Sequence, residues 1–399
     1  MADKFQKEFP QLKPGHSYLD SAAMSLKPEC VIGKVDDYYC RLSVNVHRGL
    51  YPESIEASAL YEEARAKIAR FLNASKDEIV YTRGTTNSLN MVTRFLTGSL
   101  KEGDEIITSE LEHHSSFLPW QALAKSKGLI LKFVPLDQDG RITVDNFKKV
   151  LSAKTKIVAL TYVSNVMGYI TPIEEIIGLA HEKGALVIVD AAQAVPHFKV
   201  DVKAIDADFL AFSGHKMLGP TGIGILYGKK ALLDKLEPVE YGGDMIDDVG
   251  KEVSSWKKPP YRFEAGTMPI AEAIGLGEAV TCLNRYGFDN ISKKEKLIHE
   301  TALRELAKID GVKIYNPGAD TAIIAFNLEN IPSHDAVSFY AEKGVSVRAG
   351  QHCAELLADW LGIASSLRAS FYLYNDVEDA LRLAEVTKQA IAYFRNLGF

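Results

Sequence analysis

The chain has 399 residues, of which 47% are apolar and 25% are charged, and its formal net charge is −6. This length predicts two domains with a large core, and the near-average composition argues against a disordered or fibrous protein. Because the charge is mildly negative and the basic residues are scattered, the composition also argues against a nucleic-acid-binding surface.

The amino-terminal stretch "MADKFQKEFPQLKPGHSYLD" contains acidic residues and lacks the apolar region of a signal peptide. No stretch of the sequence reaches membrane-spanning length, so we expect a cytoplasmic protein. The cysteines form no CxxC pair, which suggests neither a zinc cluster nor a disulfide framework. We expect Cys30, Cys40 and Cys282 to be packing residues.

Residues 52–73 carry apolar side chains at helical spacing and predict one long amphipathic helix. Short β-rich segments then alternate with helical patterns. This alternation is typical of βαβ units and of a mostly parallel sheet that helices cover on both faces. The strands are expected at 78–82, 105–109, 129–135, 156–163, 185–190, 208–213 and 222–228.

The last two of these strands are separated by little more than "GHKMLGPT". That connection is too short for a helical crossover, so we expect the two strands to be antiparallel neighbours in a mixed sheet. Residues 237–266 are rich in glycine and proline, and we interpret them as a functional interface loop. The remaining elements are expected as helices at 270–286, 291–309, 333–343 and 376–396 and as strands near 312–317, 321–328 and 345–349.

These elements predict an α/β protein with a mixed, mostly parallel central sheet and a smaller carboxyl-terminal α+β domain. The large domain is expected over 26–268 and the small domain over 269–399. Residues 1–25 are interpreted as an extended segment that associates with the small domain.

Ligands of open α/β sheets bind at the carboxyl ends of strands, so the polar residues that follow each strand are candidates. "RGTTNSLN" places Thr85 and Thr86 at the start of a helix, where backbone N–H groups and hydroxyls bind phosphate. Both threonines are equally suited to simple helix capping. In "ELEHHSS", His113 or His114 could stack on a flat ligand, or the two could be a solvated pair.

Two further strand ends carry polar side chains. Asn165 in "SNVMG" is a ligand candidate or a turn residue. Asp190 ends the apolar run "ALVIVD", with Gln193 just beyond, and a carboxylate in such a position needs a cationic partner.

The strand "DFLAFS" leads to Ser213, His215 and Lys216. Burial at a strand end lowers the pKa of a lysine and suits it to a Schiff base. A lysine, an aspartate, a stacking ring and a phosphate cradle together match the needs of pyridoxal phosphate. A mononucleotide held by "GPTGIG" is the rival interpretation, but its glycines precede a strand and no GxxxxGK[ST] motif is present.

In the second domain, "VSVRAGQHCAELLADWLGIASSLRASFYLYN" contains Arg348, Cys353 and Arg368. Cys353 follows His352 in a loop after a strand, a setting that favours a thiolate, although a structurally idle cysteine is the alternative. Arg368 lies in an otherwise apolar strand and requires an anion. That anion is either a substrate carboxylate or a core Asp or Glu.

Over nearly its whole length the chain resembles the group II (SufS-like) cysteine desulfurases of the class V aminotransferase family, which are fold type I pyridoxal phosphate enzymes. The most specific match is "FSGHKMLGPTGIGILYG". Further matches in the same order are "LDSAAMSLKP", "NVHRGLY", "RGTTNSLN", "EHHSS", "SNVMG", "DAAQAV", "RFEAGT", "RAGQHCA" and "LRASFYLYN".

The resemblance implies that Lys216 binds pyridoxal phosphate as an imine and that Cys353 accepts sulfur. It implies that the other cofactor contacts are Asp190 at the pyridine nitrogen, Gln193 at the ring oxygen, His113 on the ring, and Thr86, Ser213, His215 and Thr267 at the phosphate. Asn165 and Arg368 would hold the substrate carboxylate, with Arg348 near the catalytic loop and Arg48 lining the site. Thr267 and Arg48 would reach the site across a homodimer.

The implied reaction converts L-cysteine to L-alanine and leaves a persulfide on Cys353, which passes to an acceptor protein of the SufE or SufU type for iron–sulfur cluster or other thio-cofactor synthesis. Selenocysteine lyases share nearly all of these motifs, so L-selenocysteine as substrate, or another class V activity that does not need Cys353, is the alternative. Ala349 and Gln351 stand where the family usually has Thr and His. A non-catalytic scaffold that docks sulfur carriers is a third hypothesis, against which Lys216 and Asp190 argue.

Overall fold

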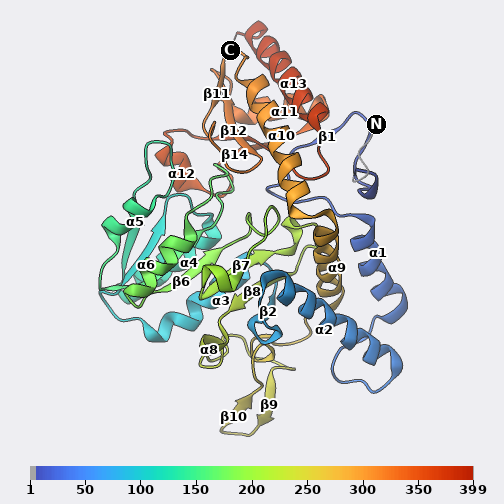
Figure 1. The fold of residues 1–399 in the computed structure, drawn as a ribbon, viewed down its shortest axis with the longest axis vertical. Helices are drawn as coiled ribbons and strands as arrows, with labels where there is room; N and C mark the ends of the chain where they lie inside the picture. Colours follow the sequence, from blue (N-terminus) through green and yellow to red (C-terminus); the bar gives the residue numbers. More distant parts are fainter. Residues whose placement is uncertain (1–5, 399) are drawn as a thin grey trace.

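A computed structural model describes residues 6–398 (Figure 1). Its central element is a sheet whose strand order is β2-β8-β7-β6-β5-β3-β4. All neighbours are parallel except β8, which runs antiparallel to both β2 and β7. The predicted strands and the antiparallel last pair are therefore confirmed. Their bounds are β2 (Ile79–Thr82), β3 (Glu105–Ser109), β4 (Ile130–Val134), β5 (Thr155–Thr161), β6 (Leu186–Asp190), β7 (Phe209–Ser213) and β8 (Gly224–Gly228).

Helices cover both faces of this sheet. Along β7, Phe209 and Ala211 belong to the core that the sheet shares with α3 and α4, whereas Leu210 and Phe212 belong to the core on the other face. Successive strand residues point to opposite faces, which is why a sheet buried on both faces has continuously apolar strands. The helices of this part are α1 (Glu29–Asp37), α2 (Pro52–Leu72), α3 (Thr85–Leu96), α4 (His114–Lys127), α5 (Val144–Val150), α6 (Ile173–Glu182), α7 (Val202–Ile205), α8 (Lys230–Leu233) and α9 (Ile270–Tyr286).

The glycine- and proline-rich segment 237–266 is not irregular throughout. It contains β9 (Ile246–Val249) and β10 (Ser254–Trp256), which pair antiparallel. Figure 1 shows this hairpin projecting from the end of the molecule opposite to the small sheet. Sequence patterns did not indicate these strands, because their residues are mostly polar and exposed.

The carboxyl-terminal part contains an antiparallel sheet of order β11-β12-β15-β14. A short parallel pair, β1 (Ser17–Tyr18) with β13 (Val345–Ser346), attaches the amino-terminal segment to this part. The other elements are β11 (Val312–Ile314), β12 (Ile323–Leu328), β14 (Arg348–Gly350), β15 (Ser366–Ser370), α10 (Phe288–Leu306), α11 (Ser333–Glu342), α12 (Glu355–Trp360) and α13 (Val377–Asn396).

The β1–β13 pair supports the proposed assignment of residues 1–25 to the small domain, which stays a proposal. Residues 1–5 of the proposed segment 1–25 and residue 399 of the proposed small domain 269–399 lie outside the described part of the chain. Helix α10 begins three residues before its expected start, since Gly287 ends α9 with a φ of 78° and leads directly into α10. None of the described helices has the length and apolarity needed to cross a membrane.

One buried ion pair fixes the end of segment 237–266 against the large sheet. Arg65 on α2, whose side chain is 1% exposed, donates to both carboxylate oxygens of Glu264 at 2.7 and 2.9 Å. Glu264 also accepts the backbone N–H of Tyr81 at 2.8 Å, and the Arg65 guanidinium lies 4.2 Å from the centre of the Tyr81 ring. The segment is thus anchored beside β2.

We expect Glu264→Gln to lower the free energy of unfolding by about 3–5 kcal/mol, because it removes the buried counter-charge of Arg65 and leaves only the partly exposed Glu62 beside the guanidinium. Urea denaturation would measure the loss. The matched control is Glu63→Gln, which breaks the exposed pair with Arg70 and should cost about 0–1 kcal/mol. Equal small losses in both variants would contradict the prediction.

Candidate active site

The carboxyl ends of the parallel strands and the small sheet together enclose a cavity of about 190 Å³. Predicted residues from both parts of the chain line it. The lining residues from the part of the chain around the large sheet are Thr85, Thr86, His113, Asn165, Asp190, Gln193, Ser213, His215 and Lys216, and those from the carboxyl-terminal part are Arg348, Cys353 and Arg368.

One end of the cavity is the start of α3. Gly84 precedes this helix with a φ of +141°, and a Cβ on Gly224 would lie 2.4 Å from the Gly84 Cα, so the start of α3 and the start of β8 are in direct backbone contact. Ser213 Oγ accepts the Thr85 backbone N–H at 2.8 Å and lies 2.7 Å from Thr85 Oγ1. The residue before α3 offers no side-chain cap, so the helix start can bind an anion such as phosphate.

Asp190 and Lys216 lie at the ends of the adjacent strands β6 and β7. Asp190 is 5% exposed and accepts the Ala192 backbone N–H at 3.0 Å. Burial raises the pKa of Asp190, and the Ala192 amide and the Lys216 charge oppose this effect. Burial lowers the pKa of Lys216, which Asp190 opposes in turn. Burial therefore shifts the Lys216 amine toward its neutral form, which suits a Schiff-base lysine.

Of the two neighbouring histidines, His113 lines the cavity, and its Nδ1 accepts the Ser115 backbone N–H at 3.1 Å. This bond fixes the ring at the start of α4. Burial and the nearby Lys216 lower the pKa of His113 to about 3, so the ring is neutral at physiological pH. His114 instead accepts the Glu355 backbone N–H at 3.2 Å, next to the small sheet. Burial likewise lowers the pKa of His215 to about 4.

Arg368 on β15 is 2% exposed and makes an ion pair with Asp20, Nη2 to Oδ1, at 3.0 Å. Its Nη1 donates to the Asn165 backbone oxygen at 2.9 Å, while its buried Nε has no hydrogen-bond partner among the described residues. Arg348 approaches the other Asp20 oxygen at 3.8 Å. The core ion pair considered as an alternative is therefore present, and one buried N–H of the Arg368 guanidinium still has no partner among the described residues.

Sequence reasoning did not identify Asp20, although it lies within the quoted motif "LDSAAMSLKP". Its partners Arg348 and Arg368 lie more than 300 positions later in the chain, so no local pattern connects them with Asp20. Gln193 is placed by its Nε2, which donates to the Ala22 backbone oxygen at 2.7 Å. The amino-terminal segment thus forms part of the cavity wall.

The loop that carries Cys353 is held in an unusual conformation. His352 and Cys353 have φ values of 55° and 57°, in the left-handed region that non-glycine residues seldom adopt. Three hydrogen bonds hold the loop. His114 N–H donates to the Cys353 oxygen at 2.8 Å, Asn165 Nδ2 donates to the His352 oxygen at 2.7 Å, and His352 Nε2 lies 3.1 Å from the Ser366 oxygen. Such strain is characteristic of functional loops, and it presents Cys353 as an exposed residue at the cavity.

His352 was not among the predicted site residues, and its position gives a pH prediction. It is 6% exposed, and burial lowers its pKa from 6.5 to about 3. Between pH 6.5 and about 3, His352 is therefore protonated in the unfolded chain but neutral in the folded chain. The stabilising contribution is complete above pH 6.5 and is lost as the pH falls toward 3, by at most about 1.4 kcal/mol per pH unit.

We expect His352→Gln to reduce the slope of unfolding free energy against pH in the range below 6.5. Urea denaturation over a pH series would measure it. His334→Gln, at an exposed position of α11, is the control and should leave the slope unchanged. A slope in His352→Gln equal to that of the unsubstituted protein would contradict the assignment of a buried neutral ring.

Two predicted residues, Arg48 and Thr267, are absent from the cavity lining described above. Arg48 forms an ion pair with Asp244. Thr267 and Asp244 both line a second cavity of about 320 Å³. Within a single chain, Arg48 and Thr267 are therefore associated with this second cavity and not with the cavity that holds Lys216.

The residues of the first cavity fit pyridoxal phosphate by their chemistry. The uncapped start of α3 suits the phosphate, the buried Asp190 suits a protonated pyridine nitrogen, and Lys216 supplies the amine. In contrast, two glycines of "GPTGIG" are occupied in tight backbone packing, since a Cβ on Gly219 would lie 2.9 Å from the Gly214 oxygen and a Cβ on Gly224 would lie 2.4 Å from the Gly84 Cα. The polar groups that line this cavity therefore favour pyridoxal phosphate over a mononucleotide.

Comparison with known proteins agrees with this geometry. The family model described as aminotransferase class-V matches residues 17–383. The chain is 49% identical over 379 residues to a probable cysteine desulfurase of Halalkalibacterium halodurans, covering 94% of this chain and 93% of the relative. It is 48% identical over 397 residues to a probable cysteine desulfurase of Staphylococcus epidermidis, covering 97% and 96%.

Among solved structures, the cysteine desulfurase CsdA of Escherichia coli superposes with a TM-score of 0.93 at 38% identity and covers 98% of both chains. The apo cysteine desulfurase of Thermococcus onnurineus NA1 gives a TM-score of 0.94 at 38% identity, with 97% of both chains covered. The described fold is thus that of solved cysteine desulfurases.

Proposed function

The chain belongs to the class V aminotransferase family, and from this premise we propose that it is a pyridoxal-phosphate-dependent cysteine desulfurase. It converts L-cysteine to L-alanine and receives the sulfur on Cys353 as a persulfide. The observation that carries the proposal is that Lys216 and Cys353, from the two parts of the chain, line one cavity.

The residues proposed to hold the cofactor lie at or after the carboxyl ends of β2, β3, β6 and β7. The start of α3 with Thr85 and Thr86, together with Ser213 and His215, would hold its phosphate. The remaining contacts are proposed for Asp190 at the pyridine nitrogen, Gln193 at the ring oxygen, His113 on the ring face and Lys216 at the aldehyde carbon. When bound, pyridoxal phosphate withdraws electrons from the substrate α-carbon.

Arg368 is proposed to bind the substrate carboxylate, with Asn165 beside it. The unpartnered Nε of Arg368 and the unpartnered Oδ1 of Asn165 support this assignment, because buried polar atoms without partners within the described part of the chain favour a polar ligand. Charge-assisted bonds to a guanidinium are strong and directional, so they orient the α-carbon of the substrate. Lys216 Nζ, whose neutral form burial favours, is the base that takes the α-proton.

Cys353 Sγ is proposed as the nucleophile. Its thiolate attacks the substrate sulfur, so that a new S–S bond forms while the bond between that sulfur and the substrate β-carbon breaks. The electron pair of the broken bond remains on the substrate carbon framework, which takes up protons and leaves as alanine. The net change adds one sulfur atom to Cys353.

We also propose that the enzyme is a homodimer in which Arg48 and Thr267 reach the partner's cavity. The surface next to Arg48 supports this, since Leu50 is 93% exposed and Ile55 is 56% exposed. Large exposed apolar side chains in one patch are typical of an interface. The exposed position of Cys353 supports transfer of its sulfur to an acceptor protein of the SufE or SufU type. A cytoplasmic location stays a prediction from composition.

The test is to incubate the purified enzyme with L-cysteine and to analyse its peptides by mass. We expect the peptide with Cys353 to gain the mass of one sulfur atom, removable by a reductant, and alanine to form in solution. Alanine formation without added mass on that peptide would overturn the persulfide mechanism and favour a lyase that does not need Cys353.

A further inference from the structure

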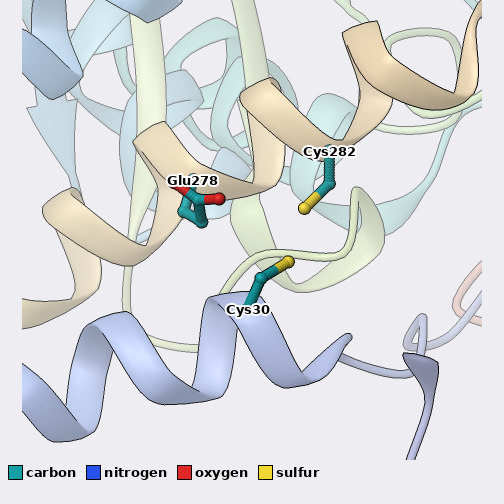
Figure 2. Close-up of side chains that lie close together, drawn as sticks. All are labelled: Cys30, Glu278 and Cys282. Carbon is teal, nitrogen blue, oxygen red and sulfur yellow. The ribbon is translucent and has the colours of Figure 1, made fainter.

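A second group of chemically reactive side chains lies apart from the active-site cavity. Cys30 on α1 faces Glu278 and Cys282 on α9, and their ligand atoms all lie within 4.8 Å of one another. Figure 2 shows the two sulfur atoms pointing toward each other between the helices, with the Glu278 carboxylate beside them. In the described structure, none of the three lines the cavity that holds Lys216.

The geometry of the two helices brings these residues together. Glu278 and Cys282 are four residues apart and therefore share one face of α9. Helix α1 packs against that face. Gly275 permits a close approach, because a Cβ at this position would lie 2.7 Å from Val35 Cγ2 on α1.

Thiolates and a carboxylate are ligands that zinc binds in tetrahedral geometry. With Zn–S bonds of about 2.3 Å, tetrahedral ligand atoms lie roughly 3.8 Å apart. The three ligand atoms, which lie within 4.8 Å of one another, would therefore need to approach by at most about 1 Å. Cys282 is buried, whereas Cys30 and Glu278 are half-buried, so a cation can reach the cluster from solvent.

The surrounding charge also suits a divalent cation. Two thiolates and one carboxylate bound to Zn²⁺ leave a single negative charge. Arg285 Nη2 lies 3.9 Å from Cys282 Sγ and would donate a hydrogen bond to the metal-bound sulfur. Arg285 is itself positioned by an ion pair with Glu8.

We propose that Cys30, Glu278 and Cys282 form a zinc site that links α1 to α9, with water as the fourth ligand. Cys282 lies in the core and Cys30 packs against it, as expected, and the proposal adds a metal-binding role to this packing. Sequence spacing could not reveal the site, because its cysteines are far apart in the chain and no CxxC pair marks them. Cys40, the other residue of that expectation, is exposed and does not fill the core.

The test titrates the metal-free holoenzyme with Co²⁺, a spectroscopic substitute for Zn²⁺, in a Cys353→Ser background that removes the active-site thiol. We expect stoichiometric binding with a thiolate-to-cobalt charge-transfer band that added Zn²⁺ abolishes. Cys30→Ser and Cys282→Ser should lose the band, and their Zn²⁺ affinity should fall by more than the roughly 10- to 100-fold that loss of an outer-shell partner costs. Cys40→Ser is the matched control and should keep the band.

A second readout is stability. Zn²⁺ should raise the midpoint of thermal unfolding in the control but not in Cys30→Ser or Cys282→Ser, because a ligand that binds only the folded state stabilises it. Absence of the band in the control, or an equal band in Cys282→Ser, would overturn the zinc site. So would mass analysis without reductant that finds the Cys30 and Cys282 peptides joined by a disulfide.

Discussion

The Lys216→Ala enzyme is expected to form alanine from L-cysteine at least about 1,000-fold more slowly than the unsubstituted enzyme. The variant removes the amine that takes the substrate α-proton, and general acid–base groups contribute roughly 10²- to 10⁴-fold to rate. The structure supports this size of effect, because burial favours the neutral form of Lys216 at the end of β7 and Asp190 faces it from β6.

Two measurements separate this effect from misfolding. Borohydride treatment should attach the cofactor covalently to the peptide with Lys216 in the unsubstituted enzyme, and the variant should show no such attachment. Lys230→Ala is the control, since Lys230 is exposed on α8 and pairs with Asp234. It should keep both activity and covalent attachment. An active Lys216→Ala enzyme with a normal unfolding midpoint would disprove the proposed base.

The second large effect is expected at Cys353. Cys353→Ser should reduce alanine formation from L-cysteine by at least about 100-fold, the lower end of what losing a catalytic group costs. Serine keeps the size and polarity of the side chain in the strained loop, so the change removes the sulfur nucleophile rather than the fold. The measurement is alanine formation together with the mass of the peptide that contains residue 353.

Cys40→Ser provides the comparison, because Cys40 is the other exposed cysteine of the described chain. It should leave both alanine formation and sulfur loading unchanged. If Cys353→Ser keeps the turnover of the unsubstituted enzyme, the reaction does not pass through a persulfide. The alternative of a selenocysteine lyase, or of another class V enzyme that does not need the cysteine, would then be favoured.

Much of the fold follows from local patterns. Apart from the partly exposed edge strand β4, each strand of the large sheet is a short, mostly apolar run bounded by a helical pattern or a turn, and a strand buried on both faces has this composition wherever it lies. The antiparallel direction of β8 follows from the short connection after Lys216 alone. The hairpin β9–β10 was missed because its polar, exposed residues give no periodic signal.

Some residues of the candidate site could likewise be predicted from local patterns, whereas others depended on the structure. Asp190, Ser213 and Lys216 could be placed from the sequence, since parallel strands end at a common edge. Asp190 and Ser213 are the last residues of β6 and β7, and Lys216 lies three residues beyond β7. Between His113 and His114, the local pattern left the choice open, and only the family resemblance pointed to His113. The structure places His113 in the cavity, because that residue caps α4 and its Nδ1 is held by the Ser115 amide.

The sequence by itself thus determined the order of the elements, the edge of the sheet where the chemistry lies and the residue types gathered there, because periodicity and turn composition act over short stretches of chain. Only the tertiary structure decided that Asp20 meets Arg368, that His352 and Cys353 adopt a left-handed backbone, and that Cys30 meets Cys282 between two helices. Each of these depends on how distant segments pack against one another, and no local pattern encodes which distant residue a side chain will contact.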